Sequence, residues 1–329
     1  MKKAKKIFGI GLGVLIVLIV AAISFTIGWR PFIGPRKRAT TSRQFERTPQ
    51  RLARGRYLAT SLLGCTGCHS KKNWAVHGAP VFPETDFAGQ VVDIQGFPGS
   101  ASIPNITPDA ETGGGTWTDD EFARAIREGI GHDGRTLFPM MPYEEFKSIS
   151  DEDVASVVVY LRSIPPVKNS VPPIQVNFPV RYLVRSVPEP LTQPVHGPNP
   201  LDRMATGKYL ANLGCGCHRE IDAIDFGGGE HLKGAWGEVT SANITSDPSG
   251  IGYYTEASFI KTIRTGYVGA RELNSVMPFS EFQNLTDDDL KAIFAYLRTV
   301  PPARHRVDNM LPPTYCKVCK HKHGGGDQN

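Results

Sequence analysis

The six cysteines of this 329-residue chain fall in three short clusters. Each cluster sets two cysteines beside one or two histidines, and the three read Cys65-Thr-Gly-Cys68-His69, Cys215-Gly-Cys217-His218 and Cys316-Lys-Val-Cys319-Lys-His321-Lys-His323. Thiols and imidazoles this close together support covalent attachment of haem, binding of zinc, or a disulfide. The spacing within each cluster favours one of these chemistries over the others.

The first cluster has the C-x-x-C-H spacing of covalent haem attachment. Two thiols add to the two vinyl groups on one edge of the porphyrin, and the adjoining histidine presents a ring nitrogen to the iron. Zinc sites also use C-x-x-C, but they need two further ligands. We therefore predict haem attachment at Cys65 and Cys68, with His69 as an axial ligand.

The second cluster has one residue between its cysteines instead of two. Cys217 still precedes His218, so one thioether and the axial bond are retained, whereas Cys215 reaches its vinyl group only if the loop distorts. We predict a second haem attached here. The alternatives are a haem held by a single thioether, a Cys215/Cys217 redox pair, and a domain without haem.

The third cluster has Lys320 where a haem-binding histidine would stand. A disulfide fits an oxidising compartment. A small metal site fits equally well, because cysteine and histidine are zinc ligands at such short spacings; its ligands would be Cys316, Cys319, His321 and His323. A lysine-ligated third haem is the weakest option, since no helical domain follows. The sequence does not separate the first two options.

The chain contains an internal repeat, which we sought first because repeats define domain organisation. Both copies contain the same motifs in the same order, namely [RK]-Y-L-A at 56–59 and 208–211, the cysteine cluster, N-I-T at 105–107 and 243–245, M-P-[YF] at 141–143 and 277–279, and Y-L-R-x-[IV]-P-P at 160–166 and 296–302. The copies are thus two homologous domains, which we place at residues 51–166 and 201–303.

The repeat also selects two methionines. Met141 and Met277 each precede Pro and an aromatic residue, and each lies 20 residues before the leucine of the last motif. A thioether opposite a histidine raises the reduction potential of haem iron. We predict Met141 and Met277 as the second axial ligands, with Met140 as the alternative in the first copy.

The elements that must position these residues are short helices between long loops. One helix leads into each cysteine cluster, a second begins at the capping box of Thr118 or at its counterpart Thr255, and a third follows Ser150 or Thr286. Proline pairs at 165–166 and 301–302 stop the last helices. No segment alternates clearly enough to predict a sheet, so we expect an all-α fold.

The composition is that of a folded protein, with 40% hydrophobic and 21% charged residues. A net charge of +5 and a pI near 8.8 are too mild to indicate nucleic-acid binding. Glycine and proline are numerous, at 34 and 26 residues, and predict long loops. We assign a Pro-rich linker to 167–200, lying against the domains, and a tail to 304–329.

The N-terminus predicts a membrane anchor. Residues 7–29 carry no charge, which is long enough to span a bilayer and longer than the core of a signal peptide. Residues 1–6 would be a cytoplasmic tail, and 30–50 a basic juxtamembrane linker solvated beside the lipid headgroups. The positive-inside rule applied to that linker would keep it in the cytoplasm; haem attachment requires export, so we place the domains in the periplasm. A removed signal peptide is the alternative.

Asparagines, tryptophans and histidines outside the cysteine clusters are expected to have structural roles. Asn105 and Asn243 are expected to make turns; a second hypothesis gives them, with Arg135 and Arg271, hydrogen bonds to haem propionates. Three tryptophans are expected to wall the haem pockets: Trp74, Trp117 and Trp236. Five histidines are expected at the surface or in turns: His77, His132, His196, His231 and His305.

On the motifs at 65–69, 105–107, 141–143, 243–245, 277–279 and both helix ends, the chain resembles the membrane-anchored dihaem cytochromes c of bacteria, cytochrome subunits of periplasmic dehydrogenases. The resemblance implies two tandem cytochrome c domains, two haem c groups, axial pairs His69/Met141 and His218/Met277, a location in the inner membrane, and single-electron transfer between a dehydrogenase or respiratory donor and an acceptor. The alternative function is a dihaem oxidoreductase acting directly on thiosulfate or peroxide, which would need an open position on one iron.

Overall fold

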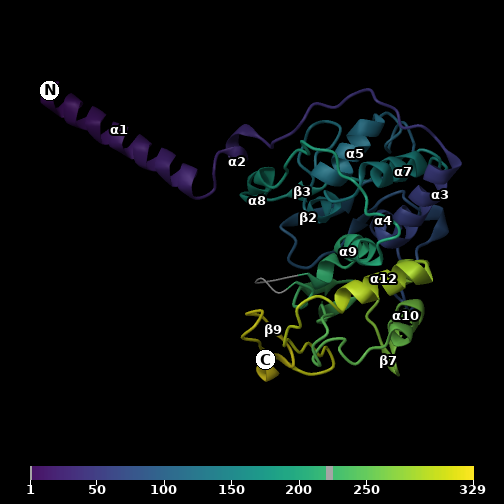
Figure 1. Cartoon of the computed structure of the whole chain (residues 1–329). Coiled ribbons are helices and arrows are strands. Elements are labelled where there is room, and N and C mark those ends of the chain that lie inside the picture. Colours follow the sequence, from purple (N-terminus) through teal and green to yellow (C-terminus); the bar gives the residue numbers. More distant parts are fainter. Residues whose placement is uncertain (1, 220–224) are drawn as a thin grey trace.

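A computed structural model describes residues 2–219 and 225–329. A long N-terminal helix projects from a body made of two lobes, one stacked on the other (Figure 1). Met1 of the predicted 1–6 tail, and residues 220–224 of the predicted 201–303 domain, lie outside the described residues.

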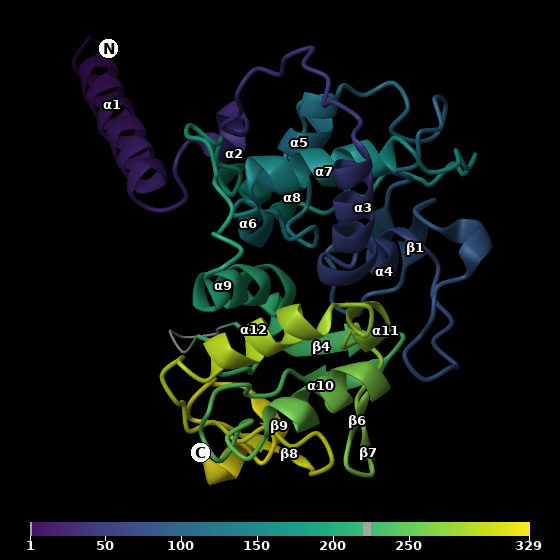
Figure 2. The same cartoon turned by 45° about the vertical axis from the view of Figure 1, so that its right-hand side comes forward.

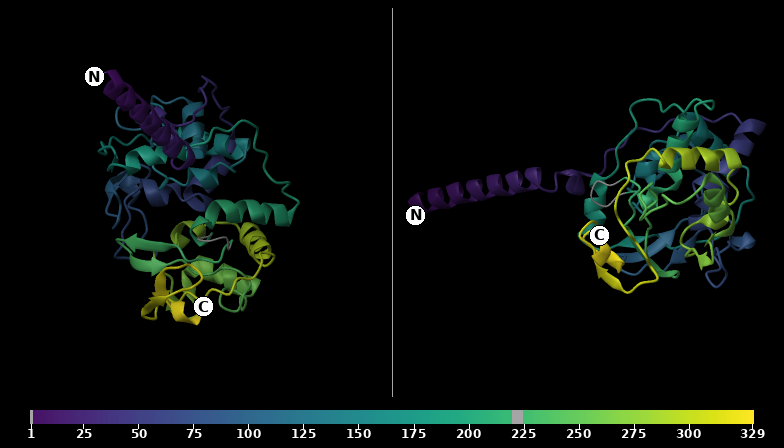
Figure 3. Two further views of the ribbon diagram at one scale, coloured as in Figure 1. Left: turned by 90° about the vertical axis from the view of Figure 1, so that its left-hand side faces the viewer. Right: turned by 60° about the horizontal axis from the view of Figure 1, so that its bottom comes forward.

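The projecting helix, α1 (Lys2–Phe25), touches little of the body (Figure 3). Its segment Lys5–Phe25 has a mean hydropathy of 2.8 and none of it is buried in the protein. By length and composition it is the one described helix able to cross a membrane, a test that a signal sequence also passes.

Helices form the framework of both lobes. Those of the first lobe are α2 (Arg30–Ile33), α3 (Pro49–Tyr57), the π-helical turn η1 (Leu58–Leu62), α4 (Cys65–His69), η2 (Pro83–Thr85), α5 (Asp119–Glu128), α6 (Tyr143–Phe146), α7 (Asp151–Leu161), α8 (Val180–Leu183) and η3 (Val184–Ser186). Those of the second lobe are α9 (Arg203–Gly214), η4 (Gly216–His218), α10 (Glu256–Thr265), α11 (Phe279–Phe282), α12 (Asp287–Leu297) and η5 (Gly326–Gln328).

The predicted helix starts are confirmed. The Thr118 hydroxyl accepts from the Glu121 backbone N–H at 3.1 Å and the Glu121 carboxylate accepts from the Thr118 N–H at 2.8 Å, which closes a capping box. Thr255 caps α10 in the same way. Ser150 and Thr286 cap α7 and α12. Equivalent caps therefore start equivalent helices in both copies.

Each lobe is built on one tight helix crossing. Helix α3 crosses α7 at Gly55, where a Cβ atom would lie 1.9 Å from the Ser156 carbonyl oxygen. Helix α9 crosses α12 at Gly207, where a Cβ atom would lie 2.0 Å from the Ala292 carbonyl oxygen. Only glycine permits backbones to approach this closely. Buried Leu, Ile, Val and Phe side chains around these crossings form the core.

The structure also contains short antiparallel strands, which differs from the all-α expectation. They form the sheet β1 (Gln90–Val92), β2 (Gly99–Ile103), β3 (Gln175–Val176) and the hairpins β4 (His231–Gly234) with β5 (Gly237–Thr240), β6 (Tyr267–Val268) with β7 (Arg271–Glu272), and β8 (Pro313–Tyr315) with β9 (Lys322–Gly324). Strands of two to five residues are too short to show an alternating pattern. The fold is therefore mostly helical with small sheets in its loops.

The basic segment 30–50 differs from its expected solvated state, because part of it is bound to the first lobe. Arg38 forms ion pairs at 2.7 Å with Asp120 and Glu128, which hold the pKa of Arg38 above its usual value. The Phe45 N–H donates to Asp119 at 2.8 Å. The Pro-rich linker lies against the first lobe as expected, since β3 within it pairs with β2.

The two lobes meet through a reciprocal pair of tyrosines, near the boundary where α9 and α12 lie (Figure 2). Tyr57 donates to Asp289 on α12 and accepts from the Thr286 N–H at 3.0 Å. Tyr209 donates to Asp153 on α7 at 2.8 Å and accepts from the Ser150 N–H at 3.1 Å. Each lobe thus inserts the tyrosine of its [RK]-Y-L-A motif into the start of the other lobe's last helix.

Candidate haem sites

The first histidine is fixed by a backbone carbonyl. His69 ends α4, is 7% exposed, and its Nδ1 lies 2.8 Å from the Pro104 carbonyl oxygen. Burial lowers the pKa of His69, so its ring is neutral at pH 7. With Nδ1 donating, the lone pair is on Nε2, the atom that a metal would take.

The second histidine repeats this arrangement. His218 Nδ1 lies 2.7 Å from the Ala242 carbonyl oxygen, and burial lowers the pKa of His218 as well. Pro104 and Ala242 each stand directly before the N-I-T motif. The two copies therefore orient their histidines with the same backbone position.

The predicted methionines occupy equivalent turns. The Met141 N–H donates to the Phe138 carbonyl at 3.1 Å, and the Met277 N–H donates to the Asn274 carbonyl at 3.0 Å. Both side chains are partly buried against the core. Met140 is not among the side chains packed on that core, which favours Met141 in the first copy.

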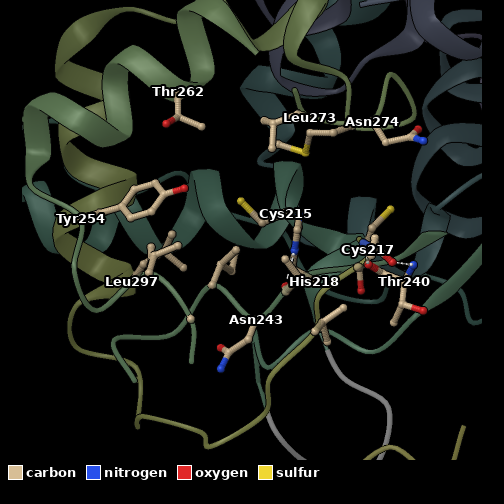
Figure 4. Close-up of a pocket in the computed structure, with 18 of the residues that line it drawn as sticks. Cys215, Cys217, His218, Thr240, Asn243, Tyr254, Thr262, Leu273, Asn274 and Leu297 are labelled. Atoms are coloured by element: carbon tan, nitrogen blue, oxygen red, sulfur yellow. Dashed lines mark hydrogen bonds between the residues drawn. The ribbon is translucent and has the colours of Figure 1, made fainter. Parts of the chain in front are cut away.

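A cavity of about 1080 Å³ opens beside the second histidine. Figure 4 shows His218 between Cys215 and Cys217, with Tyr254 and Thr262 on one side of the site and Thr240 on the other. Met277 also lines this cavity. Its volume is at the upper end of that of ligand pockets, and its wall joins a neutral histidine, two thiols and a thioether, which suits a large, flat, iron-containing group.

The N-I-T asparagines make turns, as expected. The Asn105 amide donates to Thr112 and to the Val167 carbonyl, while its oxygen accepts from the Thr107 N–H and hydroxyl. Asn243 makes the equivalent set with Ser249, Ala303 and Thr245. Both amide groups are thus already engaged within the protein. For propionates, Arg271, Arg304 and Arg306 at the wall of the second cavity are better candidates.

The lobes bring their attachment loops together. The buried pair Lys72–Glu281, at 2.9 Å, joins the loop after His69 to α11 of the other lobe. Trp74 and Trp236 pack on each other with ring centroids 5.2 Å apart, so two of the predicted pocket tryptophans contact each other across the lobes. The two attachment loops also meet directly, because a Cβ atom on Gly214, just before Cys215, would lie 3.0 Å from Leu62, three residues before Cys65.

The tail cluster is assembled differently from the sequence expectation. Cys316, Cys319 and His323 come together, but His321 is exposed and lies outside the cluster. His305, expected at the surface or in a turn, is 1% exposed and completes the group. His305 lies 11 residues before Cys316, so short-range spacing gave no signal for it.

Comparison with known proteins places residues 52–165 in the family described as Cytochrome c. The chain is similar to the cytochrome c subunit of a quinone-dependent alcohol dehydrogenase from Gluconobacter oxydans, with 29% identity over 76% of this chain and 55% of that protein. It is also similar to a gluconate 2-dehydrogenase cytochrome c subunit from Pantoea cypripedii, with 31% identity over 75% of this chain and 59% of that protein.

A third relative is a diheme cytochrome c-type protein from Cereibacter sphaeroides, with 25% identity over 72% of this chain and 82% of that protein. The chain spans little more than half the length of the two dehydrogenase subunits. The histidine and methionine positions of the first lobe lie inside the matched region. The match to the cytochrome c family thus covers most of the first lobe.

Proposed function

We propose that the chain is a membrane-anchored electron carrier with covalent haem in both lobes, which passes single electrons from a dehydrogenase subunit to a respiratory acceptor. The observation that carries this proposal is the repeated pairing of a carbonyl-oriented histidine with a Met-Pro turn in both lobes. Haem in such a site supplies a reversible one-electron iron couple.

The protein's own residues have separate tasks in this function. His69 and His218 would bind the irons through Nε2, and Met141 and Met277 would supply the second ligands. The four cysteines of the two motifs would hold the porphyrin edges: Cys65, Cys68, Cys215 and Cys217. Because Gly214, just before Cys215, packs on Leu62, just before the first cysteine motif, the two porphyrins would be attached near one another, which suits electron passage between them.

The relatives support the partner that we propose, and helix α1 supports the location. Two of them are named as cytochrome c subunits of dehydrogenases, so the donor we propose is a dehydrogenase subunit. Helix α1 would anchor the chain in the bacterial inner membrane with both lobes in the periplasm. Replacement of residues 1–29 by a cleavable signal peptide should release the protein into the periplasmic fraction. If the native protein is already soluble there and lacks these residues, α1 is a signal peptide.

Haem stoichiometry tests the proposal. Intact mass of the purified full-length chain should show two covalent haems, and pyridine haemochrome titration should agree. Tryptic peptides should carry haem at both cysteine motifs. A mass corresponding to one haem, with unmodified Cys215 and Cys217, would remove the second lobe from the electron path.

Ligand binding separates an electron carrier from the alternative oxidoreductase. With both axial positions occupied, the reduced protein should not bind carbon monoxide, and peroxide turnover should be absent. Met141→Leu should create carbon monoxide binding at the first haem, whereas Met140→Leu, the matched control, should not. Carbon monoxide binding by the wild-type protein would favour the oxidoreductase.

A further inference from the structure

The tail places four metal-binding side chains around one point. His305, Cys316, Cys319 and His323 are all buried, and their donor atoms all lie within 4.8 Å of one another. The two histidine Nε2 atoms are 3.2 Å apart. Ligand bonds of about 2.0–2.3 Å in a tetrahedral zinc site place donor atoms about 3.3–3.8 Å apart, so the cluster has the size of a single-ion site.

The histidine rings are oriented for a cation. His305 Nδ1 lies 2.7 Å from the Gly227 carbonyl oxygen, and His323 Nδ1 lies 3.0 Å from the Gly324 carbonyl oxygen. When both Nδ1 atoms donate to carbonyls, both neutral rings present lone pairs at Nε2. Two lone pairs facing each other repel, whereas a metal ion between them accepts both.

The cysteines sit on a turn shaped for two thiolates. The turn connects β8 to β9, and Lys320 after the second cysteine has φ 62°, in the left-handed region. The Val318 N–H donates to Cys316 Sγ at 3.3 Å, and the Asn329 amide donates to the same sulfur at 3.4 Å. Such donors stabilise a thiolate bound to a metal.

We propose that these four residues bind one structural zinc ion, independently of the haem sites. Two sulfur and two nitrogen donors in a buried, closed set are typical of tetrahedral zinc. The ion would join the tail to the second lobe, because His305 bonds to Gly227, and a Cβ atom on the neighbouring Gly229 would lie 3.1 Å from both Cys319 and His305.

The zinc site would also fix one wall of the second cavity. Asn309, between His305 and Cys316, donates to the Thr240 carbonyl and accepts from the Thr240 N–H, both at 2.9 Å. Asn309 and Thr240 both line that cavity, as do Arg306 and Asn329. Zinc binding would therefore hold the tail in place against the second lobe.

Zinc content of the full-length protein, purified without a polyhistidine tag, tests the proposal. Elemental analysis should give one zinc per chain, and the zinc X-ray absorption edge should show two sulfur and two nitrogen neighbours. His305→Ala and His323→Ala should fall well below one zinc. His321→Ala, the matched control on the exposed neighbour, should keep one zinc.

A second measurement uses only the wild-type protein, so it does not depend on whether the variants fold. In the wild-type protein, Cys316 and Cys319 should resist alkylation until a zinc chelator is added, as read by peptide mass. Three results would overturn the proposal. The purified protein could contain a Cys316–Cys319 disulfide, or the wild-type protein could contain no zinc. His321→Ala could also lose as much zinc as His305→Ala and His323→Ala. Stoichiometric copper or iron at these residues would overturn the choice of zinc.

Discussion

The two cysteine loops differ although the residues around them are equivalent. In the first lobe, the chain from Tyr57 to His69 passes through the π-helical turn η1, left-handed Gly64 and α4. In the second lobe, α9 runs without interruption from Arg203 to Gly214, and Cys215 follows as its C-cap. The second loop is three residues shorter between its tyrosine and its histidine.

The difference teaches which parts of the site depend on cysteine spacing. Both histidines still reach a carbonyl just before N-I-T, at 2.8 and 2.7 Å, and both methionines occupy the same turn. The helices and turns therefore set the positions of the predicted axial residues, and we infer that covalent attachment is a separate requirement. Substitutions at equivalent positions of the two lobes can test that separation.

The largest effect is expected at the buried ion pair between the lobes. Lys72→Ala would leave Glu281, which is 5% exposed, without its cation, and breaking a buried pair in this way costs about 3–5 kcal/mol. Denaturant unfolding should show a loss of this size. Lys71→Ala, on the exposed neighbour, should change the free energy of unfolding by less than about 0.5 kcal/mol.

The equivalent carboxylate offers the comparison between lobes. Glu145 occupies the same position in α6 as Glu281 does in α11, but it is only half-buried and lies near Gly216. Glu145→Gln should therefore cost clearly less than Lys72→Ala. Equal costs would contradict the larger contribution that we assign to the buried Lys72–Glu281 pair.

The helix crossings should give the next largest effect. Gly55→Val and Gly207→Val each place a side chain where a Cβ atom would lie 1.9 or 2.0 Å from a carbonyl oxygen. Overpacking of this kind costs about 3 kcal/mol. Met204→Val, at a partly exposed position on α9, is the control. If one glycine variant unfolds normally and the other does not, the two crossings are not energetically equivalent.

The reciprocal tyrosines should have a smaller, pH-dependent effect. Tyr57→Phe and Tyr209→Phe each remove hydrogen bonds across the lobes, worth about 1 kcal/mol. Burial and the bond to Asp289 raise the pKa of Tyr57 to about 12. The folded state thus binds the phenolic proton more tightly than the unfolded chain, whose pKa is about 10.

The sign of the pH effect follows from that difference. The contribution of protonated Tyr57 to the free energy of unfolding is complete below pH 10 and is lost as the pH rises towards 12. Thermal unfolding followed across this range should show a smaller decline for Tyr57→Phe than for the wild-type protein. Tyr315→Phe, on a 53% exposed side chain, should decline as the wild type does. Parallel curves for all three proteins would exclude Tyr57 as the titrating group.

Much of this architecture could be predicted from the sequence, because it rests on local signals. Helix caps such as Thr118 and Ser150 can be recognised within four residues of sequence. The internal repeat identifies Met141 and Met277 as equivalent positions. What could not be predicted depends on distant contacts. His305 is buried by the folded tail and by the segment around Gly227, and short strands such as β3 form only because another segment pairs with them. The partners of Arg38 lie more than 80 residues away.

The smallest effect is expected at the shortened cysteine loop. Cys215 and Cys217 both line the second cavity, yet Cys217 alone adjoins His218, the predicted axial ligand. Cys215→Ala should therefore retain two haems per chain by intact mass, since one thioether and the axial histidine remain. Cys217→Ala should lose haem from the second lobe. Cys65→Ala makes the change equivalent to Cys215→Ala in the first lobe.

The haemochrome spectrum then shows how Cys215 is used in the wild-type protein. An unreacted vinyl group extends the conjugation of the porphyrin and moves the absorption band to longer wavelength. If Cys215 forms a thioether despite its short spacing, Cys215→Ala should shift the band of the second haem; if it does not, the spectrum should be unchanged. A fall to one haem per chain would show instead that attachment in this lobe depends on Cys215, and that the axial framework alone does not retain the cofactor.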